Sequence, residues 1–284
     1  MCTLPAGLSE IADDYDALLC DVWGVIHNGR ESFPAALEAL VRWKAERGPV
    51  VLISNAPRPS RAIHGQLEYF KVPRAAWSAF VTSGDATRAL LRERAPGPAW
   101  MIGPPRDAPL YEGLGLQEAG PEAAAFIAVT GPYDDDVETP EDYRERFEVA
   151  AARGLTMICA NPDRVVQRGD QLIYCGGALA DLYEALGGEV LMAGKPFAPI
   201  YDLALAQAAA LKPGLASGRV LCIGDGVVTD VKGAADRQLD CLFIAKGIHG
   251  EKAMRDGRLD AKAVDALLAD EGVTARYAMA DLVW

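Results

Sequence analysis

The chain has 284 residues, of which 50% are hydrophobic and 24% are charged, and its formal net charge at pH 7 is -12. A chain of this length and composition can bury a full core and is expected to form two domains or one large one. The excess of acidic residues argues against nucleic acid as a partner, because phosphate backbones are bound by basic surfaces.

The cysteines and the apolar segments indicate where such a protein works. The six cysteines form no CxxC pair, and four of them lie in apolar, strand-like runs where cysteine acts as a small hydrophobic residue. The first residues lack a basic segment followed by a long apolar core, and no apolar stretch approaches the ~20 residues that a membrane span requires. We therefore expect a protein of the reducing cytoplasm with no membrane attachment.

The N-terminal part of the chain follows a strand-helix-strand pattern. An apolar run at 17–20 predicts a buried strand that ends at Asp21. Residues 33 to 47 place apolar side chains on one helical face, and a Gly-Pro pair ends that helix before a second strand at 50–53. Alternation of this kind is typical of a parallel sheet covered by helices.

The middle of the chain predicts a self-contained α/β insertion over residues 84–190. Its apolar runs predict strands at 100–102, 126–129 and 155–158 and a helix that carries Tyr143, Phe147 and Ala150. The acidic run Asp134–Asp136 within it is expected to be a solvated loop or a helix start rather than a metal site.

The C-terminal part returns to the pattern of the N-terminal part. Helical periodicity after Lys195 leads to a strand at 220–223, and a further helix at 229–235 is followed by a strand at 241–245. The two ends of the chain are therefore expected to build one sheet, with the insertion between them.

Polar side chains stand at or just after the ends of these strands, at Asp21, Ser54, Lys195, Asp225 and Asp230. The carboxyl ends of parallel strands meet at one edge of the sheet, where α/β proteins bind ligands. A carboxylate, a hydroxyl, an ammonium group and an acidic pair are the groups that phosphoryl transfer through a carboxylate nucleophile requires. Each residue alone reads as an ordinary cap or turn former, so the prediction rests on their joint order.

In this order and spacing, these motifs resemble the haloacid dehalogenase (HAD) superfamily, and specifically its class IIA sugar-phosphate, nitrophenyl-phosphate and pyridoxal-phosphate phosphatases. The resemblance runs from about Tyr15 to about His249 and includes three further landmarks, Thr82-Ser83-Gly84, Ala160-Asn161-Pro162-Asp163 and Cys175-Gly176-Gly177-Ala178-Leu179. It implies a Rossmann-like parallel sheet with helices on both faces, made of residues 1–83 and 191–284, and an α/β cap domain at 84–190.

The resemblance also implies a magnesium-dependent hydrolase that works through an aspartyl-phosphate intermediate. Asp21 would be the nucleophile and, with Asp225 and the backbone carbonyl of Trp23, a ligand of Mg²⁺. Asp230 is counted with the metal site, behind the direct ligands. Two carboxylates and one carbonyl suffice because Mg²⁺ prefers oxygen ligands and keeps several waters.

The remaining core residues are implied to hold the phosphoryl group. Ser54 and the backbone amide of Asn55 would donate hydrogen bonds to its oxygens, and Lys195 would add a fixed positive charge. Gly24 would allow the backbone to come close to the phosphate or the metal.

Substrate selection is implied to lie in the cap, in loops around Asn161, Asp163 and Gly176-Gly177. The spacing of these residues carries no chemical code, so the sequence predicts a small phosphorylated metabolite without naming it. It does not fix the oligomeric state either, and leaves a homodimer open.

The chain departs from the family at Trp23, where HAD phosphatases carry a second Asp that protonates the leaving oxygen. Such a group contributes ~10²- to 10⁴-fold to the rate, so ordinary phosphomonoesters should be cleaved slowly unless another group replaces it. His27, in the turn just downstream, is the nearest titratable candidate, although a His in a turn is more often only a turn residue.

Three interpretations remain open at this point. The first is a magnesium-dependent phosphatase with a replacement acid, or with a leaving group that needs no acid, as in an acyl phosphate. The second is a carbon-halogen hydrolase, which has an aromatic residue at the position of Trp23 but needs no metal, so Asp225 and Asp230 count against it. The third is a catalytically weak protein that binds a phosphorylated metabolite as a sensor or regulatory subunit.

Overall fold

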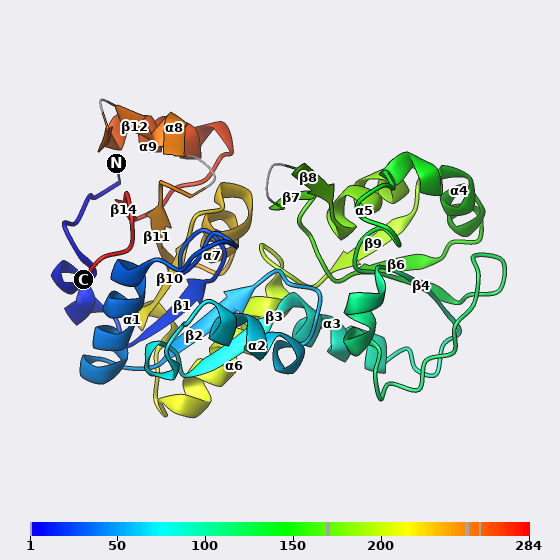
Figure 1. Cartoon of the computed structure of the whole chain (residues 1–284), viewed down its shortest axis with the longest axis horizontal. Coiled ribbons are helices and arrows are strands. Elements are labelled where there is room, and N and C mark those ends of the chain that lie inside the picture. The colour runs from blue at the N-terminus through cyan, green and yellow to red at the C-terminus, as the bar shows by residue number, and fades with distance from the viewer. Residues whose placement is uncertain (1, 169–170, 248–249, 256) are drawn as a thin grey trace. The chain divides into compact units, whose positions relative to one another are not determined.

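The computed structural model describes residues 2–168, 171–247, 250–255 and 257–284, and it contains two compact units (Figure 1). Unit 1 comprises residues 1–54, 64–81 and 201–284, and unit 2 comprises 55–63 and 82–200. His249, where the resemblance ends, lies outside the described residues. The compact units change at residues other than 84 and 190, so the predicted domain limits stay a prediction.

Unit 1 is built on a six-stranded sheet with the order β14-β11-β10-β1-β2-β3. The strands are β1 (Ala17–Asp21), β2 (Val50–Ser54), β3 (Ala79–Thr82), β10 (Val220–Gly224), β11 (Asp240–Ile244) and β14 (Tyr277–Met279). The central strand β1 is buried throughout and runs parallel to both neighbours, with Asp21 beside Ile53 and Leu19 beside Cys222. The α/β class with a parallel core sheet is therefore confirmed.

Helices connect the strands of this part of the chain, and for α1 the local sequence explains where the helix begins. They are α1 (Pro34–Glu46), α2 (Ser60–Tyr69), α6 (Ala198–Leu211), α7 (Lys232–Asp236), α8 (Gly250–Ala253) and α9 (Ala261–Asp270), with a short antiparallel pair β12 (Met254–Arg255) and β13 (Arg258–Leu259). Helix α1 starts on a proline, which needs no hydrogen-bond partner there, and buries Ala36, Leu40 and Trp43 on one face. The predicted helix at 33–47 is confirmed.

The strand order places a topological switch between β1 and β10. From β1 the chain moves outward through β2 to β3, and it later returns beside β1 at β10 and moves outward in the other direction to β11 and β14. Ligands of open α/β sheets bind outside the carboxyl ends of the strands at such a switch. Asp21 is the last residue of β1, and Asp225 directly follows β10.

Unit 2 has its own parallel sheet with the order β4-β5-β6-β9. Its elements are α3 (Ser83–Arg92), β4 (Ala99–Ile102), β5 (Phe126–Val129), α4 (Arg144–Ala152), β6 (Thr156–Cys159), the hairpin β7 (Val165–Arg168) and β8 (Gln171–Tyr174), α5 (Gly176–Ala185) and β9 (Glu189–Met192). A core with Trp100, Phe147 and Tyr183 at its centre packs α4 and α5 on this sheet. The predicted strands at 100–102, 126–129 and 155–158 are thus present, with small shifts at their ends.

Two local predictions need correction. The helix expected at 229–235 opens with a π-helical turn at 227–231, and α7 follows it. The acidic run is not simply solvated, because Asp135 is only 9% exposed and pairs with Arg106. Among the described residues, no helix has the length and apolar character that crossing a membrane would demand.

Candidate active site

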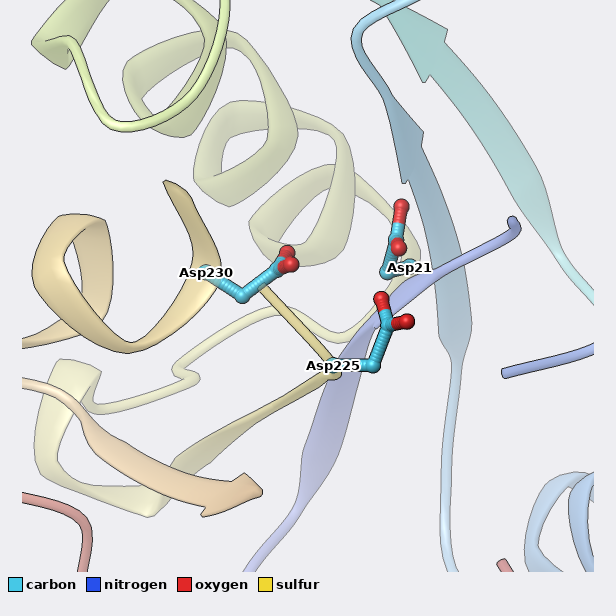
Figure 2. Close-up of side chains that lie close together, drawn as sticks. All are labelled: Asp21, Asp225 and Asp230. Atoms are coloured by element: carbon cyan, nitrogen blue, oxygen red, sulfur yellow. The ribbon is translucent and has the colours of Figure 1, made fainter. Parts of the chain in front are cut away.

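Three carboxylates gather at the switch point of unit 1, and we call them the acidic cluster: Asp21, Asp225 and Asp230. One oxygen from each lies within 4.8 Å of the others, and the three residues are 5%, 2% and 4% exposed (Figure 2). Burying negative charges this close together is costly unless a cation joins them. Oxygen donors in this number and spacing fit a hard divalent cation such as Mg²⁺.

Glycines make the room in which Asp225 sits. A Cβ at Gly24 would lie 2.1 Å from Oδ2 of Asp225, and a Cβ at Gly247 would lie 1.9 Å from the same atom. Gly24 also has a φ of +83°, which side chains rarely adopt. The backbone on two sides therefore fixes the position of this carboxylate.

The Asp230 side chain is fixed by its own loop. Its Oδ2 accepts a hydrogen bond from the backbone N–H of Gly226 at 3.0 Å and from the Thr229 hydroxyl at 3.3 Å. Gly224 leaves space for it, since a Cβ there would lie 2.1 Å from Cγ of Asp230. The π-helical turn thus orients one member of the acidic cluster through short local contacts.

The loop after Asp21 is held by backbone hydrogen bonds. The N–H of Ile26 donates to the carbonyl of Val22 at 2.9 Å, and the N–H of Gly24 donates to the carbonyl of His27 at 2.8 Å. Trp23, at the position where the family carries its second Asp, is 37% exposed and brings no titratable group.

His27 is buried in this loop and stacks on the ring of Phe70, with centroids 4.2 Å apart. Its Nδ1 accepts a hydrogen bond from the N–H of Gly29 at 3.2 Å. Burial lowers the pKa of His27 to about 4, so its imidazole is neutral at neutral pH. A general acid would need the imidazolium form, and the surroundings of His27 therefore count against that role.

A second group of predicted residues meets within unit 2 around the side chain of Asn55. Its Nδ2 donates to Oδ1 of Asp163 at 2.9 Å and to the Lys195 carbonyl at 3.2 Å, and its Oδ1 accepts from the Lys195 N–H at 2.7 Å. Asn161, two residues before Asp163, is also buried, and its Oδ1 accepts a hydrogen bond from the Asp163 N–H at 3.1 Å. Asn55 thus ties Lys195 to the loop that carries Asp163.

The structure brings the predicted residues together in these two groups. Ser54 ends β2 in unit 1, one position beyond the register partner of Asp21. Lys195 is 3% exposed in unit 2.

The chain matches two family models and a solved structure of similar sequence. The model of the family described as haloacid dehalogenase-like hydrolase matches residues 18–117, and the HAD-hydrolase-like model matches residues 192–270. The crystal structure of a haloacid dehalogenase-like hydrolase from Brucella suis is 44% identical in sequence, covers 99% of this chain and 100% of that chain, and superposes with a TM-score of 0.86. The chain belongs to the haloacid dehalogenase-like hydrolase family.

More distant HAD-like structures share the fold. A p-nitrophenyl phosphatase from Archaeoglobus fulgidus is 21% identical over 94% of this chain and 97% of that chain, with a TM-score of 0.72. A glycerol phosphate phosphatase from Mycobacterium tuberculosis, in complex with calcium, is 22% identical over 84% and 68%, with a TM-score of 0.63. No functionally curated protein is similar enough in sequence to add a comparison.

Sequence reasoning missed the residues that shape this HAD-like site without chemistry of their own. Gly247, Thr229 and Phe70 contact Asp225, Asp230 and His27 respectively. Gly247 had a usable signal, since a glycine soon after a strand marks a close approach of the backbone. Phe70 carried none, because an aromatic residue at the end of a helix most often only packs.

Proposed function

We propose that this HAD-like hydrolase is a magnesium-dependent phosphatase that acts on a small phosphorylated metabolite through an aspartyl-phosphate intermediate. The observation that carries the proposal is the acidic cluster at the switch point between β1 and β10. Membership of the family and the fold shared with known phosphatases support it.

In this proposal the ion is held by Asp21, Asp225 and the Trp23 carbonyl, with Asp230 behind them. When bound, Mg²⁺ would offset the negative charge of the phosphoryl group and of the attacking carboxylate. The donor set fits this role, because the cluster found among the described residues offers carboxylate oxygens, the ligands that Mg²⁺ prefers.

The residues of the chain would then act in two steps. An oxygen of Asp21 attacks phosphorus, and the electron pair of the breaking bond passes to the leaving oxygen. Water next attacks phosphorus, which releases inorganic phosphate and restores the carboxylate of Asp21. Ser54, the Asn55 N–H and Lys195 would bind the phosphoryl oxygens, with Lys195 held by the Asn55 side chain.

The proposal gives the leaving oxygen no acid from the protein. Trp23 cannot supply a proton at neutral pH, and His27 is neutral and buried. With no acid at either of these positions, the proposed leaving group is one that is stable as an anion or takes its proton from solvent. Aryl and acyl phosphates should react faster than alkyl phosphates.

The substrate would be selected by unit 2, through Asn161, Asp163 and the neighbouring loops. Asp163 is linked to Lys195 through Asn55, so a contact at that loop could influence the position of the phosphate-binding backbone. A core with residues 84–190 replaced by a short linker should keep turnover of small activated esters and lose discrimination among metabolites.

The test is phosphate release from phenyl, acetyl and alkyl phosphates, with and without Mg²⁺. Asp21→Asn should lower turnover by at least ~10³-fold while the far-ultraviolet circular dichroism stays unchanged, because it removes the nucleophile at constant size. Comparable turnover in the variant would refute the assignment of Asp21 as the nucleophile. A shallow dependence of the rate on leaving-group pKa in the wild type would refute the proposal that the protein gives the leaving oxygen no acid.

A further inference from the structure

Trp23 differs from the other four tryptophans of the chain. Trp43, Trp77 and Trp100 are buried, Trp284 is half-buried, and Trp23 alone is exposed, at 37%. An indole with this exposure is open to contact by a ligand, and large rings with a polar end are common in binding sites.

The indole of Trp23 is held in one orientation. Its ring lies against Gly29, where a Cβ would come within 2.3 Å of Cη2, and Gly29 has a φ of +82°. The edge of its ring contacts His27 with centroids 5.3 Å apart at 76°, and His27 in turn stacks on Phe70. These contacts make a preorganised aromatic surface, which loses little freedom when a ligand binds.

This surface stands next to the acidic cluster. Trp23 is two residues beyond Asp21, and the next residue, Gly24, lies against the carboxylate of Asp225. An isolated bridge joins Trp23 to His27 after a bend at Val22. Because two residues span at most about 7 Å, a leaving group on a phosphoryl group held at Asp21 is within reach of the Trp23 indole.

We propose that Trp23 is the stacking surface for the leaving group and that the substrate is an aryl phosphate, a monoester of a planar aromatic hydroxyl. This inference rests on the proposed function and narrows its substrate class. Stacking on an aromatic side chain is worth roughly 5- to 150-fold in affinity. An aromatic hydroxyl also leaves without an acid, so one residue accounts for both the recognition and the missing proton donor. An acyl phosphate would also need no proton donor, but it would not be recognised by stacking.

Phosphonates test the inference separately from hydrolysis, because they carry no leaving oxygen. Binding of phenylphosphonate, cyclohexylphosphonate and methylphosphonate is measured by calorimetry in the presence of Mg²⁺. Phenyl and cyclohexyl groups are similar in size, and only phenyl is planar. We expect phenylphosphonate to bind about 10-fold more tightly than cyclohexylphosphonate, and Trp23→Leu to abolish that preference.

Tyr69→Leu is the matched control, since Tyr69 is 77% exposed and lies at the far end of the same row of rings, against Phe70. It should leave the preference for phenylphosphonate within about twofold of the wild type. Equal affinities of the two ring compounds in the wild type would overturn the inference, and so would a preference that survives Trp23→Leu. A protein that releases phosphate from acetyl phosphate but does not bind phenylphosphonate keeps the proposed function and loses the aryl substrate. Failure to release phosphate from any ester would instead refute the proposed function.

Discussion

The two parallel sheets of this protein carry different chemistry at the same structural position. In unit 2, the segments that follow β4 and β5 carry Arg106, Asp107 and Asp135, and charges of opposite sign meet there, with Arg106 on Asp135 and Arg58 3.5 Å from Asp107. In unit 1, the segments that follow β1 and β10 bring three charges of the same sign within 4.8 Å.

The difference separates what a fold provides from what a function requires. A parallel sheet places polar loops at the carboxyl ends of its strands in any protein. Opposite charges at such an edge, such as Arg106 and Asp135, pair with one another. Three carboxylates positioned by glycines and local hydrogen bonds offer the oxygen ligands that a divalent cation takes, which is why the proposed site lies at the unit 1 edge.

The sharpest test replaces one acid from each edge. Asp225→Asn should lower turnover at 1 mM Mg²⁺ by about 10³-fold and remove most of the stabilisation by Mg²⁺. In the wild type, Mg²⁺ at 100 times its Kd should stabilise by ~2.7 kcal/mol, which raises Tm by about 5–10 °C in calorimetry.

Asp135→Asn serves as the comparison for that test. It breaks the pair with Arg106 and should lower Tm in the absence of metal, yet the shift in Tm caused by Mg²⁺ should persist. Equal loss of the Mg²⁺ response in both variants would mean that the acidic cluster does not differ from an ordinary buried pair.

A smaller effect is expected from the glycine that positions Asp225. Gly247→Ala places a Cβ 1.9 Å from Oδ2 of that carboxylate, which must then move. We expect kcat/KM for phenyl phosphate to fall by about 10- to 100-fold, since a displacement of ~1 Å can cost this much. Gly218→Ala meets no atom within 4 Å and should change kcat/KM by less than about twofold. Similar losses of kcat/KM in the two variants would show that Gly247 does not act by positioning the Asp225 carboxylate.

The smallest effect concerns stability and the loop beside the cluster. The pKa of His27 is about 4 in the folded protein and 6.5 when unfolded, so the unfolded state takes up a proton first as pH falls. The contribution to stability is full above pH 6.5 and is lost as pH falls towards 4. Between pH 7.5 and 5 the wild type should lose about 2 kcal/mol from this source.

His27→Phe, which keeps an aromatic ring and does not titrate, provides the baseline. Urea unfolding at the two pH values gives the difference between the two proteins. The same loss of stability in His27→Phe would show that other groups cause it.

The sequence was sufficient for the parts of the fold that depend on local patterns. Apolar runs that end in a polar residue located the ends of β1, β2 and β10, and with them Asp21, Ser54 and Asp225. The family resemblance supplied the reason to group them. Strand order was not readable, because the pairing of β1 with β10 depends on packing between segments 200 residues apart and leaves no local trace.

What the sequence could not provide were contacts between distant side chains. The predicted solvated loop at Asp134–Asp136 was wrong for Asp135, whose partner Arg106 lies 29 residues away. His27 was expected in a hairpin-like stretch, and it forms bridges with Trp23 and Ser32 after the turn. Its burial against Phe70 decides its charge, and no spacing rule predicts that contact. The three hydrogen bonds of the Asn55 side chain span still larger separations, of 108 and 140 residues.

The pairing of β10 with β1 affects how the protein can fold during its synthesis. As the chain emerges from the ribosome, β1, β2 and β3 can pair early, while the other edge of β1 waits for a strand that is synthesised some 200 residues later. Unit 2 is complete in sequence before β10 appears. The nascent chain must therefore protect a central strand edge throughout the synthesis of unit 2, and the acidic cluster assembles only when Asp230 has left the exit tunnel.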